Sequence, residues 1–336
     1  MEQAAGSDVL LAYGATGLLA AFNAAGVLDA PDVRTAQTIG RIGREPEERV
    51  VLALALAVRA LRSGSVCIDL RTVSTLAFEE SEAGIDLSSL PWPDPAEWLA
   101  LVAASGLVAD GPDQPGGRPL RLANGLLYLE RYWHQEEQVR QALQQRLAAD
   151  PPDLDRERLR VALDRLFRRS AAGHSTDGQQ LAVAVSALGR VAVIAGGPGT
   201  GKTTTVARLL ALLTDQPGPT PRIALAAPTG KAAARLAEAV RSEAAKLPPE
   251  DCQRIGDVSA STLHRLLGWL PGSRGRFRHD ANNQLPHDLV IVDEMSMVSL
   301  TMMARLLEAV RPSARLILVG DPDQLSSVEA LSLIHI

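Results

Sequence analysis

The sequence predicts an α/β protein in which a domain built on a parallel sheet follows a mainly helical N-terminal domain. In the second half of the chain, short apolar runs alternate with helical patterns, and a polar or glycine-bearing turn follows each run. That alternation is typical of a parallel sheet. Residues 1 to about 115 show mostly helical apolar spacing instead. The strands expected in the second half are residues 190–195, 223–227, 289–292 and 316–319.

The composition is that of an ordinary soluble protein, because 46% of the 336 residues are hydrophobic and 22% are charged. A formal net charge of -5 argues against a broadly basic nucleic-acid binder, so any nucleic-acid contact should be local. Cys67 and Cys252 lie far apart and suggest neither a disulfide framework nor a metal site. The N-terminus lacks the basic start of a secretory signal, and the apolar run 50–58 is too short to cross a bilayer. We therefore expect a cytoplasmic protein with no membrane segment.

The N-terminal domain is expected to span residues 1–150 and shows none of the usual catalytic patterns. We interpret Trp92 and Trp98 as core residues in preference to base-stacking ones. The segment 111–119 is rich in glycine and proline and therefore indicates an exposed loop. Helices are expected at 45–61, after Pro95 and at 133–147, and strands at 66–70 and 126–129.

Residues 151–176 are expected to form a linker that carries a basic helix, residues 156–169. The arginines of this helix could face DNA, but a solvated helix surface is the favoured interpretation. Residues 178–180 then precede a helix expected at 181–188, which leads into the first strand of the sheet.

A phosphate-binding loop follows that first strand. Residues 196–203 match the pattern GxxxxGK[ST] at every fixed position, between an apolar strand and a helix with apolar spacing. Glycines let the backbone wrap closely round a phosphate, so that amide N–H groups and a helix N-terminus face the anion. Lys202 can reach the β- and γ-phosphates, and the Thr203 hydroxyl can bind Mg²⁺. The residues expected to hold the nucleotide here are Gly196, Gly197, Pro198, Gly199, Thr200, Gly201, Lys202, Thr203 and Thr204.

Acidic residues and a glutamine follow the third and fourth expected strands. Asp293 would hold Mg²⁺ beside Thr203, and Glu294 would orient or deprotonate the attacking water. The structural alternative for this pair is an acidic helix N-cap, which the phosphate-binding loop makes the weaker interpretation. Gln324 lies just past the fourth strand, where an amide can hydrogen-bond a γ-phosphate. The residues expected to carry catalysis are Lys202, Glu294 and Gln324.

Two further segments carry groups that suit the backbone of a nucleic acid. After the second expected strand, Thr229 and Lys231 offer a hydroxyl, an ammonium and neighbouring backbone amides. Farther along, Thr262 and His264 add a hydroxyl and an imidazole beside an arginine. A lone histidine is usually structural, so its neighbours carry the argument for His264. We expect these four residues to bind DNA.

In their order and spacing, five segments resemble the first motor domain of superfamily one DNA helicases. More narrowly, they resemble the RecD family of subunits of the bacterial RecBCD nuclease-helicase, exodeoxyribonuclease V. The segments are GGPGTGKTTT, APTGKAAARL, STLHRLLG, VIVDEMSM and LVGDPDQL. The resemblance is most specific over residues 177–330, where it implies a RecA-like P-loop NTPase domain that uses ATP and Mg²⁺. It gives Gln179 the position of the glutamine that reads adenine and lets Gln324 couple the γ-phosphate to DNA.

The resemblance extends more weakly upstream, to residues 64–70 and 127–133. These resemble the helical N-terminal domain of the family, which docks onto the partner subunits. The family implies a 5′-to-3′ DNA helicase that runs along one strand of a broken duplex in double-strand break repair and homologous recombination. It also implies RecB-like and RecC-like partners, one of which carries the nuclease site.

The family pattern continues beyond the point where this sequence ends. A complete helicase of this class has a second RecA-like domain with an arginine finger, worth roughly 10³ to 10⁵ in turnover in related NTPases. We expect the chain to be truncated after Ala330, and residues 331–336 resemble the translation of a sequencing adapter more than native protein. Such a fragment should bind ATP weakly, hydrolyse it very slowly and unwind nothing.

Other interpretations stay open. A stand-alone RecD-like helicase would need no partner, but it would carry a helix-hairpin-helix N-terminal region that the sequence does not show. A nucleotide switch such as a GTPase would need a guanine-reading [NT]KxD pattern, which is absent, and Gln179 favours adenine. The last alternative is an interaction module whose motor domain is inert.

Overall fold

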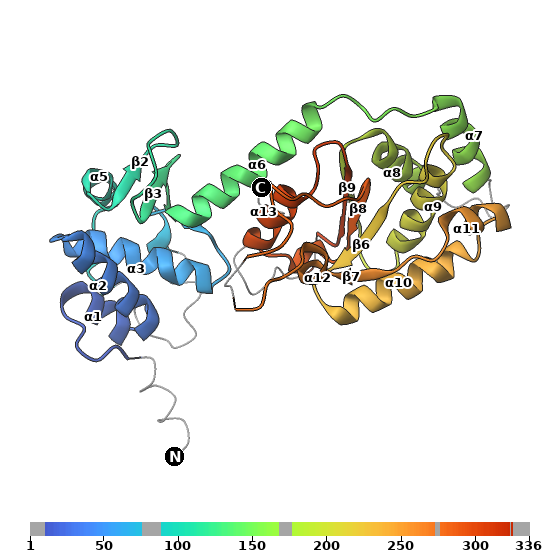
Figure 1. The fold of residues 1–336 in the computed structure, drawn as a ribbon. Coiled ribbons are helices and arrows are strands. Elements are labelled where there is room, and N and C mark those ends of the chain that lie inside the picture. Colours follow the sequence, from blue (N-terminus) through green and yellow to red (C-terminus); the bar gives the residue numbers. More distant parts are fainter. Residues whose placement is uncertain (1–10, 76–88, 168–176, 273–275, 323, 325–336) are drawn as a thin grey trace, which may run out of the picture. The chain divides into compact units, whose positions relative to one another are not determined.

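The computed structural model describes residues 11–75, 89–167, 177–272, 276–322 and 324. The chain divides into two compact units between Gln135 and Glu136, within helix α6 (Glu130–Ala148) (Figure 1). The domain boundary proposed near residue 150 stays a prediction. The end of the expected basic helix, residues 168–169, and the tail 331–336 lie outside the described residues. Among those described, no helix is long and apolar enough to cross a membrane.

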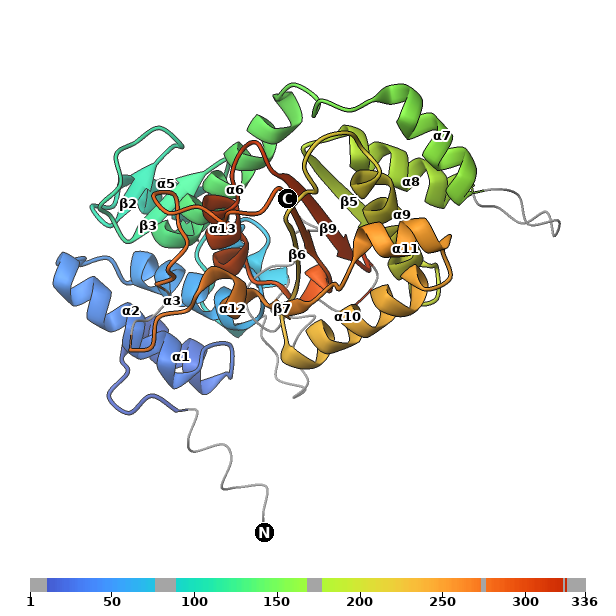
Figure 2. The ribbon, with the colours of Figure 1, turned by 45° about the vertical axis from the view of Figure 1, so that its right-hand side comes forward.

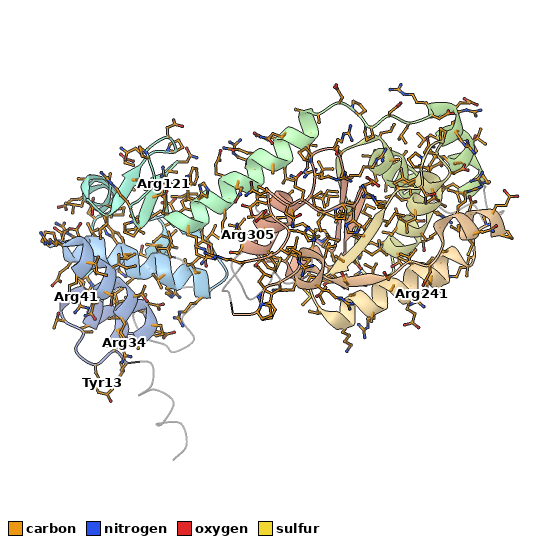
Figure 3. The ribbon with its side chains drawn as sticks, viewed as in Figure 1. Tyr13, Arg34, Arg41, Arg121, Arg241 and Arg305 are labelled. Carbon is orange, nitrogen blue, oxygen red and sulfur yellow. The ribbon has the colours of Figure 1, made fainter. Side chains whose placement is uncertain are left out.

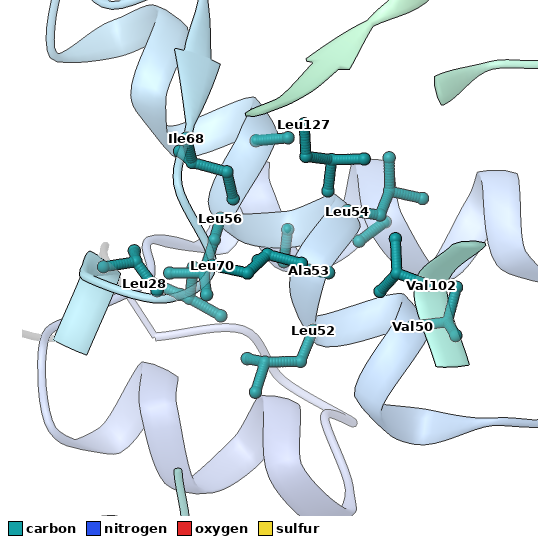
Figure 4. Packing of buried hydrophobic residues seen from close by; sticks show 14 of the residues in the cluster. Leu28, Val50, Leu52, Ala53, Leu54, Leu56, Ile68, Leu70, Val102 and Leu127 are labelled. Atoms are coloured by element: carbon teal, nitrogen blue, oxygen red, sulfur yellow. The ribbon is translucent and has the colours of Figure 1, made fainter. Parts of the chain in front are cut away.

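The core of the N-terminal unit forms around α3 (Glu48–Arg62), whose residues 52–57 are all nearly or fully buried. Helices α1 (Gly17–Ala24), α2 (Ala30–Gly43) and α5 (Pro95–Ala104) contribute to the same core (Figure 4). Trp98 is 1% exposed, and its indole N–H donates to the carbonyl of Arg49 at 2.8 Å. Trp92 packs edge-on against Phe22 with ring centroids 4.5 Å apart. The interpretation of both tryptophans as core residues is therefore confirmed.

A four-stranded sheet completes this unit, in the order β1-β4-β3-β2. Its strands are β1 (Cys67–Ile68), β2 (Val108–Asp110), β3 (Leu120–Ala123) and β4 (Leu126–Leu129). The sequence predicts β1 and β4 but not the short β2 and β3. Arg121 on β3 is buried and donates to Glu130 and to the carbonyls of Gly111 and Gln114 (Figure 3). These bonds hold the exposed glycine- and proline-rich loop against the sheet.

The second unit is built on a five-stranded sheet in which every pair is parallel (Figure 2). Its order is β5 (Val191–Ala195), β9 (Arg315–Gly320), β8 (Leu289–Val292), β6 (Ile223–Ala227) and β7 (Ala260–Thr262). The α/β class and the four predicted strands are confirmed. All residues of β8 are buried, as an apolar run without alternation predicts for a strand covered on both faces. The edge strand β5 is buried on one face only, because buried and exposed residues alternate along it and Val193 is 65% exposed.

Helices cover both faces of this sheet (Figures 1 and 2). One core joins the sheet to α7 (Arg156–Leu166), α8 (Asp177–Leu188), α9 (Lys202–Thr214), α10 (Gly230–Ala244) and α11 (Pro249–Ile255). The short α12 (Leu263–Leu267) and α13 (Leu300–Ala309) contact each other on the opposite side. Two sequence expectations change: α7, within the expected linker, packs in this core, and α8 begins before Gln179 rather than after it. The start of α8 was misplaced because its polar first turn carries no apolar spacing. Helix α7 packs in the core because Leu159, Ala162 and Leu166 form an apolar face among its arginines.

Candidate nucleotide site and nucleic-acid contacts

The phosphate-binding loop leaves the carboxyl end of β5 and returns as the N-terminus of α9. The Gly196 amide donates to the Gly320 carbonyl at 3.2 Å, which fastens the start of the loop to β9. The Lys202 ammonium donates back to the carbonyls of Gly196 at 2.5 Å and Gly197 at 3.0 Å. The Thr200 hydroxyl also donates to the Gly197 carbonyl, at 2.9 Å. The side chains of Lys202 and Thr200 therefore close the loop on itself.

Two glycines of this loop are required by its geometry. Gly201 has φ +86, a left-handed conformation that costs other residues energy, and a Cβ there would lie 2.2 Å from Nε2 of Gln179. A Cβ on Gly196 would lie 2.6 Å from Oγ1 of Thr200. The glycines of the motif thus permit both the turn itself and the close approach of α8 to the loop.

A cavity of about 460 Å³ opens beside the loop. It gathers Lys202, Thr203 and Thr204 with Asp293 and Glu294, although about 90 residues separate the two groups in sequence. Pro198 and Gln324 are exposed and are not among its lining residues. The lining residues are Gly197, Gly199, Thr200, Gly201, Lys202, Thr203, Thr204, Val206, Leu236, Ala239, Ser242, Glu243, Asp293, Glu294 and Val319.

The acidic pair lies at the carboxyl end of β8. The amide of Asp293 donates to the Ala226 carbonyl on β6 at 2.9 Å, and the amide of Glu294 donates to Oδ1 of Asp293 at 2.9 Å. Burial raises the pKa of Asp293, and the neighbouring Glu294 charge adds to this while Lys202 opposes it. Glu294 has φ 56 and makes no side-chain bond that caps the following 3₁₀ helix (Met295–Met297). Its carboxylate therefore does not serve as the helix cap that the alternative interpretation requires.

Gln179 lies in the first turn of α8, against the phosphate-binding loop. Its Nε2 donates to the Thr200 carbonyl at 3.0 Å, and its Oε1 accepts from Arg208 on α9 at 3.1 Å. The structure thus places Gln179 against the loop, although Gln179 is not among the residues that line the cavity. Gln324 lies farther along the same edge of the sheet, where its Nε2 donates to the buried Asp321 at 3.1 Å.

The residues expected to contact DNA lie at the other end of the same sheet edge. Thr229 caps α10 after β6, and Thr262 caps α12 after β7, each accepting a backbone N–H bond at 3.2 Å. These two strands are paired in parallel, with Ala227 opposite Thr262. Lys231 and His264 are exposed, and the His264 ring lies 5.9 Å from that of Phe277. The four side chains thus follow two adjacent strands.

Two different family models match the two units of the chain. Residues 24–128 match the family model described as the N-terminal domain of RecBCD enzyme subunit RecD, and residues 179–330 match the AAA domain model. RecBCD enzyme subunit RecD of Mycobacterium tuberculosis is 54% identical over 329 residues, covering 96% of this chain and 53% of that protein. The same subunit of Mycolicibacterium smegmatis is 51% identical over 321 residues, which cover 93% of this chain and 52% of that protein.

This chain belongs to the RecD family. It spans about half the length of the curated RecD proteins that it matches. The ATP-dependent RecD2 DNA helicase of Deinococcus radiodurans is a more distant relative, 45% identical over 42% of this chain and 17% of that protein. The AAA domain match covers most of the second unit, including the phosphate-binding loop and the acidic pair.

Sequence reasoning missed several residues at the candidate nucleotide site. Glu243 on α10 accepts from the Thr204 hydroxyl at 2.9 Å and lines the cavity, although nothing in its sequence neighbourhood suggests this. Asp321 is 4% exposed and holds Gln324. Arg208 follows Thr204 by one helical turn on α9, so helical periodicity could have placed it on the same face.

Proposed function

We propose that the cavity beside the phosphate-binding loop binds ATP with Mg²⁺. The backbone N–H groups of Gly197 and of residues 199–203, at the N-terminus of α9, would surround the β-phosphate, and Lys202 would exchange its carbonyl partners for phosphate oxygens. Gln179 would read the adenine. The single observation that supports this most is the cavity itself, which gathers the loop and the acidic pair at one place.

The acidic pair suits a magnesium ion held together with substrate phosphates. Mg²⁺ prefers hard oxygen ligands and is usually held in NTPases by one or two protein groups plus phosphate oxygens. In the part of the chain that the structure describes, no group of three or more His, Cys, Asp or Glu could hold a metal alone. Thr203 and Asp293 would be the protein ligands. Burial raises the pKa of Asp293, and a bound cation would offset the cost of the buried carboxylate charge. When bound, the ion would neutralise charge that develops on the phosphates.

Hydrolysis would depend on Glu294 and on the exposed amide of Gln324. Glu294 sits at the cavity wall with a carboxylate available to orient a water molecule or take its proton. Gln324 would hydrogen-bond the γ-phosphate and would shift when that phosphate leaves. This shift would couple hydrolysis to the DNA contacts after β6 and β7. There, Thr229, Lys231, Thr262 and His264 would bind the backbone of single-stranded DNA.

For the whole protein we propose a 5′-to-3′ DNA helicase that acts with RecB-like and RecC-like subunits in the cytoplasm, in double-strand break repair and homologous recombination. The 54% identity to a RecD subunit over 96% of this chain supports this assignment. The first unit would be the docking domain, because it matches the RecD N-terminal model.

The test uses the full-length protein assembled with its partners. Lys202→Ala should remove DNA-stimulated ATP hydrolysis and leave complex formation intact, because the lysine donates its hydrogen bonds to loop carbonyls and is not among the buried core residues. The loss of ATP hydrolysis should also stop translocation along the DNA strand that this subunit engages. Unchanged ATP turnover by the Lys202→Ala subunit would overturn the proposed nucleotide site.

A stand-alone helicase is the second candidate, since the chain also matches a RecD2 helicase. The match of residues 24–128 to the N-terminal domain of the RecBCD subunit favours the partner-dependent form. Purification of the native protein separates the two candidates. Recovery with two large partners in fixed ratio supports the subunit, and a monomer that unwinds DNA alone supports the RecD2-like form.

A further inference from the structure

The amide of Gln179 is held by protein groups on both sides. Its Nε2 donates to the Thr200 carbonyl at 3.0 Å, and its Oε1 accepts from Nη1 of Arg208 at 3.1 Å. A carbonyl can only accept and a guanidinium can only donate. Rotating the amide by half a turn would therefore set oxygen against oxygen and N–H against N–H. The two partners together fix which end of the amide is the acceptor.

Arg208 is itself fixed from the opposite side. Its guanidinium lies over the ring of Phe167, with the central carbon 4.4 Å from the ring centroid, a distance typical of a cation–π contact. Phe167 is 6% exposed and belongs to the core beneath α7 and α9. The side chain of Arg208 is thus sandwiched between a buried ring and the Gln179 amide. Burial lowers the pKa of Arg208, and the nearby Glu243 charge opposes that shift.

We propose that Arg208 determines the base selectivity of this site by holding the Gln179 amide in a single orientation. Arg208 is a positioning residue in this proposal, because it acts on the base through Gln179. The inference rests on the proposed nucleotide site and goes beyond it in assigning the origin of the selectivity. It also gives α7 a part in nucleotide recognition, through Phe167.

The fixed orientation suits adenine and opposes guanine. One amide proton of Gln179 and one lone pair of its oxygen remain after the two protein bonds are made. Adenine offers an N7 acceptor and an N6 donor on one edge, which such an amide can pair with at both atoms. Guanine offers two acceptors, N7 and O6, so the fixed oxygen would face another oxygen. A bidentate pair of this kind discriminates by about 5- to 150-fold.

Arg208→Met tests the proposal, because methionine keeps an apolar stem over Phe167 but cannot donate to Gln179. The dissociation constants of the Mg²⁺ complexes of a non-hydrolysable ATP analogue and its GTP counterpart are measured on the full-length protein. We expect wild type to prefer the adenine analogue about 5- to 150-fold and Arg208→Met to lose most of that preference. Arg208→Lys keeps one donor and should retain part of it. Arg160→Met is the matched control, since Arg160 is an exposed arginine on α7 that pairs with Glu157.

A double-mutant cycle separates positioning from a merely structural role. In a Gln179→Ala background, Arg208→Met should change the adenine-to-guanine ratio no further. An equal loss of affinity for both analogues, or a full effect of Arg208→Met without Gln179, would overturn the proposal. So would an unchanged ratio in a folded Arg208→Met variant. If wild type binds neither analogue, or if Lys202→Ala leaves binding unaltered, the proposed nucleotide site itself fails.

Discussion

Replacing Gly201 with alanine perturbs the turn on which the nucleotide site depends. The residue has φ +86, and an L-residue there costs about 1–2 kcal/mol. The new Cβ would lie 2.2 Å from Nε2 of Gln179, so the amide must move away. Its bonds to Thr200 and Arg208 would then be lost, at about 0.5–1.5 kcal/mol each. The sum predicts a loss of about 2–5 kcal/mol in the free energy of unfolding, with weaker and less base-selective nucleotide binding.

Urea denaturation followed by circular dichroism measures this loss, and Gly197→Ala provides a control within the same loop. A Cβ on Gly197 would meet nothing within 4 Å, and no positive φ requires glycine there. We expect Gly197→Ala to change the unfolding free energy by no more than about 0.5 kcal/mol. Equal effects of the two alanines would refute the argument from backbone conformation and from the approach of Gln179.

Three further predictions concern other parts of the second unit. Arg146→Met should lower the free energy of unfolding by about 2–4 kcal/mol, because the buried guanidinium donates to three backbone carbonyls just after α13. The control is Arg140→Met, on an exposed position of the same helix, which should cost no more than about 0.5 kcal/mol in the same denaturation assay. Hydrogen bonds from Arg222 lower the pKa of Asp288 from 3.8 to about 2. The ionised carboxylate therefore stabilises the fold at pH values above 3.8, and this contribution is lost as the pH falls through about 2. Asp288→Asn should therefore cost about 1 kcal/mol at pH 7, after screening of this half-exposed pair, and the gap to wild type should close as the pH falls from about 4 to 2. Lys231→Ala should weaken single-stranded DNA binding alike for all sequences and lower the salt slope by about 0.7, measured by fluorescence anisotropy; an unchanged slope would remove Lys231 from the DNA contacts.

The sequence predicts the parallel sheet because strands such as 289–292 are buried on both faces and therefore carry uninterrupted apolar runs. It does not predict β7, since Ala260–Thr262 is only half-buried and short. The strand depends on pairing with β6, which lies more than 30 residues earlier. Complete burial alone did not decide the outcome, since the half-buried β5 was predicted and the fully buried β3 was missed. Local pattern identified strands that carry continuous apolar runs, and it missed short strands such as β3, where Arg121 interrupts the run, and β7.

The sequence likewise predicts some residues of the candidate site and not others. The phosphate-binding loop and Asp293 with Glu294 are recognisable because their spacing and flanking strands are local features. Glu243 is not recognisable, because its contact with Thr204 joins two helices 39 positions apart. The left-handed conformation of Glu294 is likewise invisible to propensity, since residues other than glycine rarely adopt it. Such backbone strain tends to occur at functional sites.

Calorimetric titration of this chain with a non-hydrolysable ATP analogue, with and without Mg²⁺, tests the central claim most directly. We predict saturable binding at one site that is strengthened by Mg²⁺, is weakened at least tenfold by Lys202→Ala, and exceeds binding of the matching GTP analogue. Binding that is identical in the Lys202→Ala variant, or that favours guanine, would contradict the assignment of the loop at Gly196–Thr203 as an ATP site.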